Sequence, residues 1–102
     1  MDRNEAISAI KSALRERSGK AWSVTGGRGT AYGWLTISAP PARRVGYDYM
    51  TDDDRAELGR LLGMDKPCHR QGESVPASNA HYREYVARAA GLPFVTAERY
   101  WD

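Results

Sequence analysis

A glycine–arginine run is the part of the chain whose residue types most suggest chemistry. Residues 25–30 read Thr-Gly-Gly-Arg-Gly-Thr, and glycines allow positive φ and a close approach of backbone N–H groups to a ligand. With the guanidinium of Arg28, such a turn could hold a phosphate or an acidic side chain. The run lacks the Gly-Lys-Ser/Thr of a Walker loop, and it joins strand to strand, unlike a dinucleotide fingerprint. We therefore expect no cofactor; a hairpin turn that simply needs glycine is the alternative interpretation.

Aromatic and basic residues flank this turn on both sides. Tyr32 and Trp34 alternate along the returning strand, and rings that face away from the core could stack on bases or anchor a partner protein. Exposed rings beside cationic side chains form a platform for stacking and phosphate contacts. The alternative is that a helix covers this face and places the rings in the core. The candidate binding residues are Lys20, Arg28, Tyr32, Trp34, Arg43 and Arg44.

Two further groups of residues invite a metal or catalytic interpretation. A structural zinc site needs four ligands, usually in close pairs, and Cys68, His69 and His81 supply only three soft ligands. A thiol nucleophile needs a base within hydrogen-bond distance, which adjacency in sequence does not provide. We expect no metal and no catalytic residue, and a partly exposed Cys68 thiol in a polar loop. The three aspartates at 52–54 point about 100° apart on a helix, so they fit a first turn better than a magnesium site.

Charge is distributed unevenly along the chain. The net charge is +2, but residues 1–47 carry eight basic and three acidic side chains, whereas residues 48–102 carry seven basic and ten acidic ones. Such asymmetry can mark a surface for an anionic partner. Arginine outnumbers lysine twelve to three, and arginine suits phosphate and carboxylate groups. An accidental clustering of cations, or a coding bias toward arginine, explains the same numbers.

Length and composition indicate one α+β domain over residues 1–102. Hydrophobic residues make up 41% of the chain and charged residues 27%, which is typical of a folded globular protein. A single cysteine excludes an internal disulfide and favours a reducing compartment. No stretch reaches the roughly 18 apolar residues of a membrane helix, and the charged N-terminus lacks the apolar run of a signal peptide. We expect a cytoplasmic protein that does not associate with membranes.

The N-terminal half predicts a helix followed by a hairpin. Helical spacing of apolar residues covers residues 3–18, with Asp2 as the N-cap and Gly19 as the left-handed residue that ends the helix. Apolar and polar residues then alternate over 22–25 and 31–38, which is typical of strands with one buried face. The residues expected to face the helix are Trp22, Val24, Leu35 and Ile37. Two prolines at 40–41 stop the second strand.

The C-terminal half predicts two more helices separated by a long loop. Residues 43–49 suit a third, edge strand, and Thr51 caps a second helix that closes at Gly63. The loop 64–78 has no helical period and room for a short strand around residues 74–75; loops this long are often functional or mobile. A third helix follows over 81–90, capped by residue 78 or 79. The aromatic tail 94–101 should dock on the core or add a short strand.

Part of the N-terminal half resembles a known family. Residues 20–24 read Lys-Ala-Trp-Ser-Val, and the Gly/Arg turn and Tyr-Gly-Trp at 32–34 follow. This pattern resembles the large polyvalent protein-associated domains of bacteria and phages, in which a leading helix precedes a similar strand and hairpin. The likeness covers roughly residues 5–50. It implies an accessory module of phages and conjugative plasmids without known catalysis.

Taken together, the residues favour a small non-enzymatic binding module. Its basic and aromatic N-terminal half would contact nucleic acid or another anionic partner. An alternative is a protein-binding accessory factor or an inhibitor of a host protein, because Trp, Tyr and Arg are typical of interface hot spots. Catalysis by the loop between Cys68 and His81 ranks third. The sequence leaves the oligomeric state open.

Overall fold

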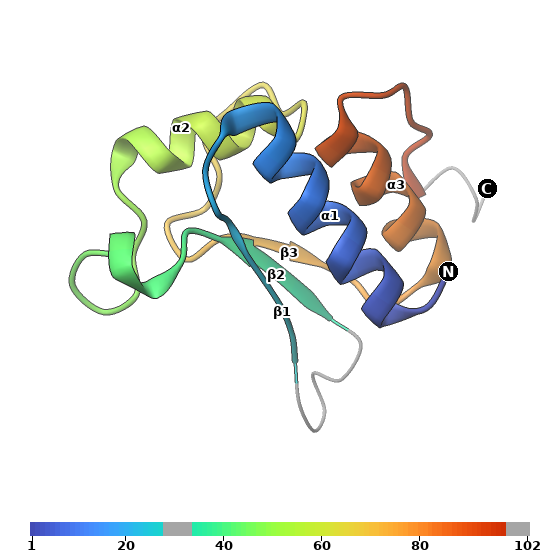
Figure 1. Cartoon of the computed structure of the whole chain (residues 1–102), viewed down its shortest axis with the longest axis horizontal. Coiled ribbons are helices and arrows are strands. Elements are labelled where there is room, and N and C mark those ends of the chain that lie inside the picture. The colour runs from blue at the N-terminus through green and yellow to red at the C-terminus, as the bar shows by residue number, and fades with distance from the viewer. Residues whose placement is uncertain (28–33, 98–102) are drawn as a thin grey trace.

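The computed structural model describes residues 1–27 and 34–97 of the chain, and it has the predicted α+β fold (Figure 1). The elements in chain order are α1 (Arg3–Ser18), β1 (Ser23–Gly26), β2 (Leu35–Ser38), η2 (Pro41–Arg43), α2 (Asp52–Leu61), β3 (Glu73–Val75) and α3 (Asn79–Ala90). Among these described residues, no helix has the length and apolar character needed to cross a membrane.

The helices begin and end where their capping residues predict. The Asp2 carboxylate accepts the Glu5 N–H at 2.8 Å, and this hydrogen bond holds the pKa of Asp2 below its ordinary value. Gly19 ends α1 at φ 72°, a conformation that costs glycine little. Thr51 and Ser78 cap α2 and α3 in the same way as Asp2 caps α1. The predicted bounds of the first helix are confirmed.

The three strands form one antiparallel sheet in the order β1-β2-β3. Val24 pairs with Ile37 in the register of β1 and β2, and Leu35 pairs with Val75 in the register of β2 and β3. All four of these side chains are buried, because strand residues two apart share a face. The predicted hairpin and the predicted short strand near residue 74 are therefore confirmed. Trp22 is also buried, so the prediction of which hairpin side chains face the helix is confirmed as well.

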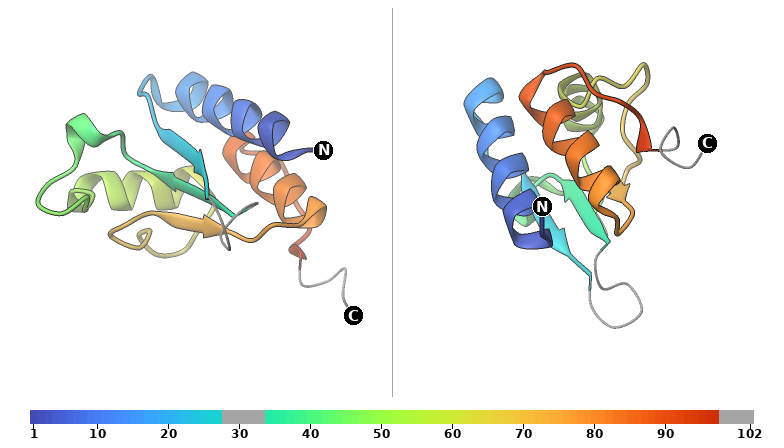
Figure 2. Two further views of the ribbon diagram at one scale, coloured as in Figure 1. Left: turned by 90° about the horizontal axis from the view of Figure 1, so that it is seen from below. Right: turned by 90° about the vertical axis from the view of Figure 1, so that its right-hand side faces the viewer.

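Within the part of the chain that the structure describes, helices cover one face of the sheet and leave the other free. Helices α1 and α3 lie side by side over the same face (Figure 2), where Ile10, Leu14 and Tyr82 join the core. On the opposite face Thr25 and Ser74 are exposed and Thr36 is half-buried. This opposite face thus presents hydroxyl groups to solvent.

The predicted edge strand at 43–49 is wrong. Pro41 begins the 3-10 turn η2, in which the Arg43 N–H donates to Pro40 O at 2.9 Å. The chain then closes on itself, with the Val45 N–H donating to Tyr49 O at 2.7 Å and the Tyr49 N–H donating back at 3.0 Å. Proline has no N–H to give to a ladder, and the tight turn that follows leaves no extended run to pair with β2.

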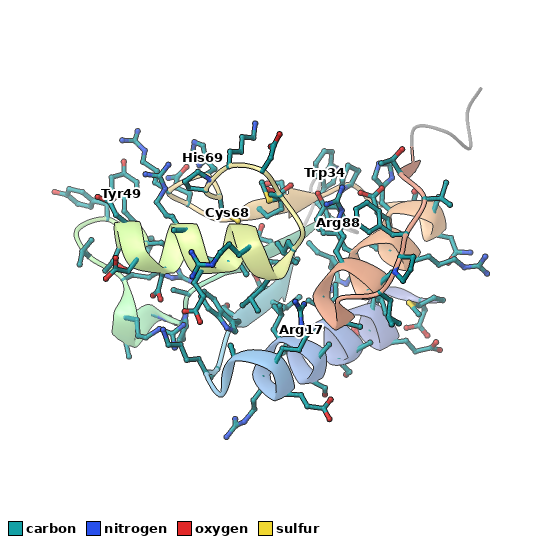
Figure 3. The ribbon with its side chains drawn as sticks, turned by 90° about the horizontal axis from the view of Figure 1, so that it is seen from above. Arg17, Trp34, Tyr49, Cys68, His69 and Arg88 are labelled. Atoms are coloured by element: carbon teal, nitrogen blue, oxygen red, sulfur yellow. The ribbon has the colours of Figure 1, made fainter. Side chains whose placement is uncertain are left out.

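Arginine side chains tie the helices together at their C-terminal ends. Arg17 of α1 donates through Nη1 to Leu61 O at 2.8 Å and to Ala89 O at 2.7 Å (Figure 3). Arg88 donates through Nη1 to Leu62 O at 2.9 Å. The last carbonyls of a helix lack partners within the helix, so these guanidinium groups satisfy carbonyls of α2 and α3 while joining the two helices to α1.

The chain after α3 packs against that helix. Ala97 is buried, and its N–H donates to Glu84 Oε1 at 2.6 Å. The prediction that the aromatic tail docks on the core is not confirmed, because Phe94 and Val95 are exposed and the described part of the tail contacts α3 through Ala97. The rest of the predicted segment, 98–101, lies outside the described residues.

Candidate functional site

Trp34 stands on the helix-free face of the sheet. It directly precedes β2, and alternation along the strand places it on the same face as Thr36. Its side chain is 45% exposed, whereas Trp22 is 3% exposed and packs in the core. An exposed indole beside a strand with a solvent-facing side is a ready surface for stacking.

Hydroxyl side chains cross the sheet next to Trp34. The register aligns Thr25 with Thr36 and Thr36 with Ser74, so one row of three hydroxyl groups spans all three strands. Each hydroxyl can donate one hydrogen bond and accept two. Because these side chains are short, the row leaves the surface flat beside the tryptophan ring. We call Thr25, Trp34, Thr36 and Ser74 the open face.

A hollow of about 540 Å³ opens at the β3 side of the open face. It lies where the loop before β3 passes beside the strands. In Figure 3 the side chains of Tyr49, His69 and Trp34 lie along one side of the molecule, away from α1. The hollow is lined by Thr36, His69, Gln71, Gly72, Glu73 and Ser74.

The loop that forms the hollow is anchored to α2 and to the turn before it. The Cys68 N–H donates to Arg55 O at 3.0 Å, and the Arg55 Nε donates back to Cys68 O at 2.9 Å. The Met50 N–H donates to Arg70 O at 2.8 Å, and the Arg70 guanidinium lies 4.5 Å from the centre of the Tyr49 ring. Two backbone–backbone hydrogen bonds, one hydrogen bond from the Arg55 side chain and one cation–π contact therefore fix the loop in place.

Gly72 allows the loop to return to the sheet. Its φ is +112°, and a Cβ atom built there would lie 2.6 Å from Ile37 O and 2.9 Å from the Ser38 Cβ. The Gly72 N–H donates to His69 O at 2.8 Å, and the Gln71 N–H donates to His69 Nδ1 at 3.2 Å. Since Nδ1 accepts, a neutral His69 ring carries its proton on Nε2.

The predicted cations Lys20 and Arg43 meet at a different place, around two carboxylates of α2. Lys20 Nζ lies 2.6 Å from Glu57 Oε1 and 3.9 Å from Asp54 Oδ1, and Arg43 Nε lies 3.2 Å from Asp54 Oδ2. Arg43 also stacks 4.8 Å from the Trp22 ring centre. Two cations and two carboxylates balance, so this cluster joins η2, α2 and the start of β1 without a net positive charge.

The remaining predicted residues divide into three groups. Arg44 Nε donates to Ala39 O at 2.7 Å, and its Nη1 lies 3.5 Å from Asp48 Oδ1. Trp34 belongs to the open face. Arg28 and Tyr32 lie outside the described residues. None of the residues that line the hollow was predicted from the sequence as a binding residue. The length and polarity of the loop 64–78 did indicate that this segment could be functional.

Cys68 is a buried thiol, which corrects the predicted partial exposure. Its side chain is 0% exposed, and its Sγ lies 3.7 Å from the sulfur of Met64. Burial raises its pKa from the ordinary value of 9.0 to about 12, because a thiolate loses solvation in an apolar site. His81 is occupied elsewhere, with Nδ1 2.7 Å from the hydroxyl of Ser78. Within the described ranges, no three His, Cys, Asp or Glu side chains gather into a metal-binding group.

The buried thiol makes the fold sensitive to alkaline pH. As pH rises above about 9, the thiol of the unfolded chain loses its proton while folded Cys68 keeps it, so the fold loses about 1.4 kcal/mol per pH unit. Burial also raises the pKa of Tyr85, which adds a loss in the same direction at higher pH. Urea unfolding of the protein and of Cys68→Ala between about pH 8 and pH 10 measures the effect. Cys68→Ala should have a lower free energy of unfolding at every pH, but that free energy should no longer fall as the pH rises. An equal fall in both proteins would contradict the argument from the buried thiol.

The open face and the hollow thus combine one exposed indole, a row of hydroxyl groups and a preformed polar recess. No model of a protein family, no curated protein and no solved structure matches this chain. What the surface can bind follows from its own side chains.

Proposed function

We propose that this chain is a non-enzymatic binding module for single-stranded nucleic acid, with bases stacking on Trp34 over the open face. The observation that carries the proposal is the position of Trp34. A ring of this size, 45% exposed, stands on the face of the sheet that α1 and α3 leave free. Bases of single strands stack on such rings with little regard to sequence, because every base has a π-face.

The shape of the surface favours unpaired bases over a duplex. Stacking on a protein ring requires a base whose own face is free, which a base inside a duplex does not offer. The hydroxyl row beside Trp34 supplies short donors for phosphate or sugar oxygens and leaves space for a flat base. A single strand can therefore lie along the sheet with one base on the ring.

The charges near the open face predict a weak dependence on salt. Arg70 is exposed and lies between His69 and Gln71 in the sequence, with its guanidinium over the Tyr49 ring. Lys20 and Arg43, in contrast, are balanced by carboxylates. Arg28, a second candidate phosphate contact from the sequence, lies outside the described residues. Each neutralised phosphate contributes about −0.7 to the slope of log affinity against log salt for single strands. With one or two contacts we expect a slope of about −0.7 to −1.4.

Fluorescence anisotropy of a labelled oligothymidylate tests the proposal. An oligomer of about 10 nucleotides matches the size of single-strand sites, and Trp34→Ala should raise its Kd about 5- to 150-fold, because one stacked base is worth about 1–3 kcal/mol. Tyr47→Ala is the matched control, since Tyr47 is 88% exposed but sits on the Val45–Tyr49 turn. Its Kd should stay at the wild-type value. Equal affinities of wild type and Trp34→Ala would refute the stacking site.

A second candidate function, recognition of a host protein, is favoured by the turn that presents Tyr47. Asp48 holds φ 66°, an uncommon backbone conformation for a residue with a side chain, and the turn lifts the Tyr47 ring into solvent. Such residues cluster at functional sites. If this second function is correct, the wild type captures a protein from a bacterial lysate, and the capture survives nuclease treatment. Tyr47→Ala then abolishes the capture, whereas Trp34→Ala reduces it less.

A further inference from the structure

The hollow near Trp34 is lined mainly by hydrogen-bonding groups, with the His69 ring and one carboxylate among them. Thr36 and Ser74 contribute hydroxyl groups, and Gln71 contributes an amide. The one carboxylate in the lining, that of Glu73, accepts the Tyr85 hydroxyl at 2.7 Å. A phosphate would favour cationic donors, and a metal ion would need several anionic ligands, whereas the lining offers one carboxylate. A neutral, planar group with both donors and acceptors is the better complement.

The edge of a nucleobase is such a group. The Gln71 side chain is exposed, and a glutamine amide both donates and accepts. The pattern that matches it is the adjacent acceptor N7 and donor N6 of adenine, which glutamine contacts through two hydrogen bonds. Hydroxyl groups such as those of Thr36 and Ser74 can serve either kind of atom on the base.

The hollow is also correctly placed for a base next to the one on Trp34. Trp34 and Thr36 are two positions apart on one face of the same strand, which corresponds to about 6.6 Å along the chain. A strand stacked on the tryptophan ring therefore brings a neighbouring base to the wall formed by Thr36. Stacking and edge contacts would then fall on adjacent parts of one single strand.

The hollow is formed before any ligand arrives. Cys68 is locked to Arg55 by two hydrogen bonds, Arg70 O accepts the Met50 N–H, and Gly72 fits directly against Ile37. A preorganised site avoids the cost of ordering a loop on binding. The long polar loop is thus a fixed wall of the recess.

We infer that this hollow is a pocket for one unpaired adenine, read by Gln71, next to the base stacked on Trp34. The inference rests on the proposed binding of single strands and adds a base preference to it. Gln71 would select the base, while Trp34 would supply affinity that is independent of sequence.

Anisotropy titrations with an oligothymidylate and with the same oligomer carrying one central dA, dC or dG test the pocket. The wild type should bind the dA oligomer about 10-fold more tightly, since a bidentate contact discriminates by about 1–3 kcal/mol. Gln71→Leu should reduce the dA affinity to that of oligothymidylate and leave the oligothymidylate affinity unchanged. Gln71→Glu should shift the preference to dC, because a carboxylate accepts from cytosine N4.

Each result decides between the pocket and the wider proposal. Equal affinity for all four oligomers, or an adenine preference that survives Gln71→Leu, overturns the pocket but leaves Trp34-dependent binding standing. Absence of binding to every oligomer overturns both. Because the Gln71 side chain is exposed and only its backbone N–H bonds to His69, neither substitution should alter the unfolding temperature, which serves as the check on folding.

Discussion

Replacing Glu84 by alanine is expected to lower the free energy of unfolding by about 3–5 kcal/mol, the range for removing one partner of a buried ion pair. Glu84 is 6% exposed. Its Oε2 accepts from Arg88 Nε at 2.8 Å, and its Oε1 accepts the Ala97 N–H at 2.6 Å. Alanine would leave a mostly buried guanidinium without its carboxylate and a buried N–H without an acceptor.

The neighbours of Arg88 place the expected loss in the upper part of this range. The guanidinium lies 3.9 Å from the centre of the Phe94 ring and 5.2 Å from that of Tyr85, while its Nη1 holds Leu62 O. The Glu84 carboxylate orients the Arg88 guanidinium. Removing Glu84 therefore loosens the contacts that Arg88 makes between α3, the end of α2 and the segment after α3. Networks of this kind fail together because their members polarise and position one another.

Urea unfolding of three variants separates these contributions. Glu84→Gln keeps an oxygen that can accept the Ala97 N–H but removes the charge, so its loss should be about half that of Glu84→Ala. Glu16→Ala removes an exposed glutamate from α1 and should change stability by less than about 0.5 kcal/mol. A Glu84→Ala protein as stable as the Glu16→Ala protein would show that the network contributes nothing.

Gly72→Ala is expected to cost about 2–4 kcal/mol and to erase the adenine preference. Two penalties add: φ of +112° is unfavourable for a residue with a Cβ, and that Cβ would lie 2.6 Å from Ile37 O and 2.9 Å from the Ser38 Cβ. These obstacles belong to β2, a central strand that cannot move aside cheaply. The loop would have to shift away from the sheet and would take Gln71 with it.

Gly46→Ala is the matched control for Gly72→Ala. Gly46 has φ +57°, and nothing lies within 4 Å of a Cβ built there, so only the left-handed conformation is penalised, by about 1–2 kcal/mol. Its adenine preference should equal that of the wild type. Chemical unfolding and the oligomer titrations measure both properties, and equal losses for the two alanine variants would mean that contact with β2 is unimportant.

Features that depend on a few adjacent residues were predictable from the sequence. Asp2 and Gly19 bound the first helix because a cap and a left-handed terminus are local signals. Apolar and polar residues alternate strictly around Val24 and Ile37. Once a helix covers one face of the sheet, only one orientation of the two strands buries the apolar side chains, so the inward face of the hairpin was predictable. The fold class follows from these same local patterns.

Features that depend on distant residues were not predictable from spacing. Cys68 sits in a polar stretch, which indicates exposure, but folding packs this stretch against α2, where Arg55 Nε donates to Cys68 O from 13 positions away. Lys20 meets Glu57 across 37 positions, so a basic stretch of sequence became a balanced cluster. Trp34 was identifiable as a candidate by its type and its alternation, whereas the polar recess beside it required the path of the loop.

The guanidinium of Arg17 has a consequence for how the protein emerges from the ribosome. Its acceptors lie 44 and 72 positions further along the chain, at Leu61 and Ala89. A nascent chain from which α3 has not yet emerged therefore lacks the Ala89 acceptor of Arg17 and half of the helical layer over the sheet. Stable structure must wait until α3 has emerged, and a translation product truncated before α3 would remain open to proteolysis.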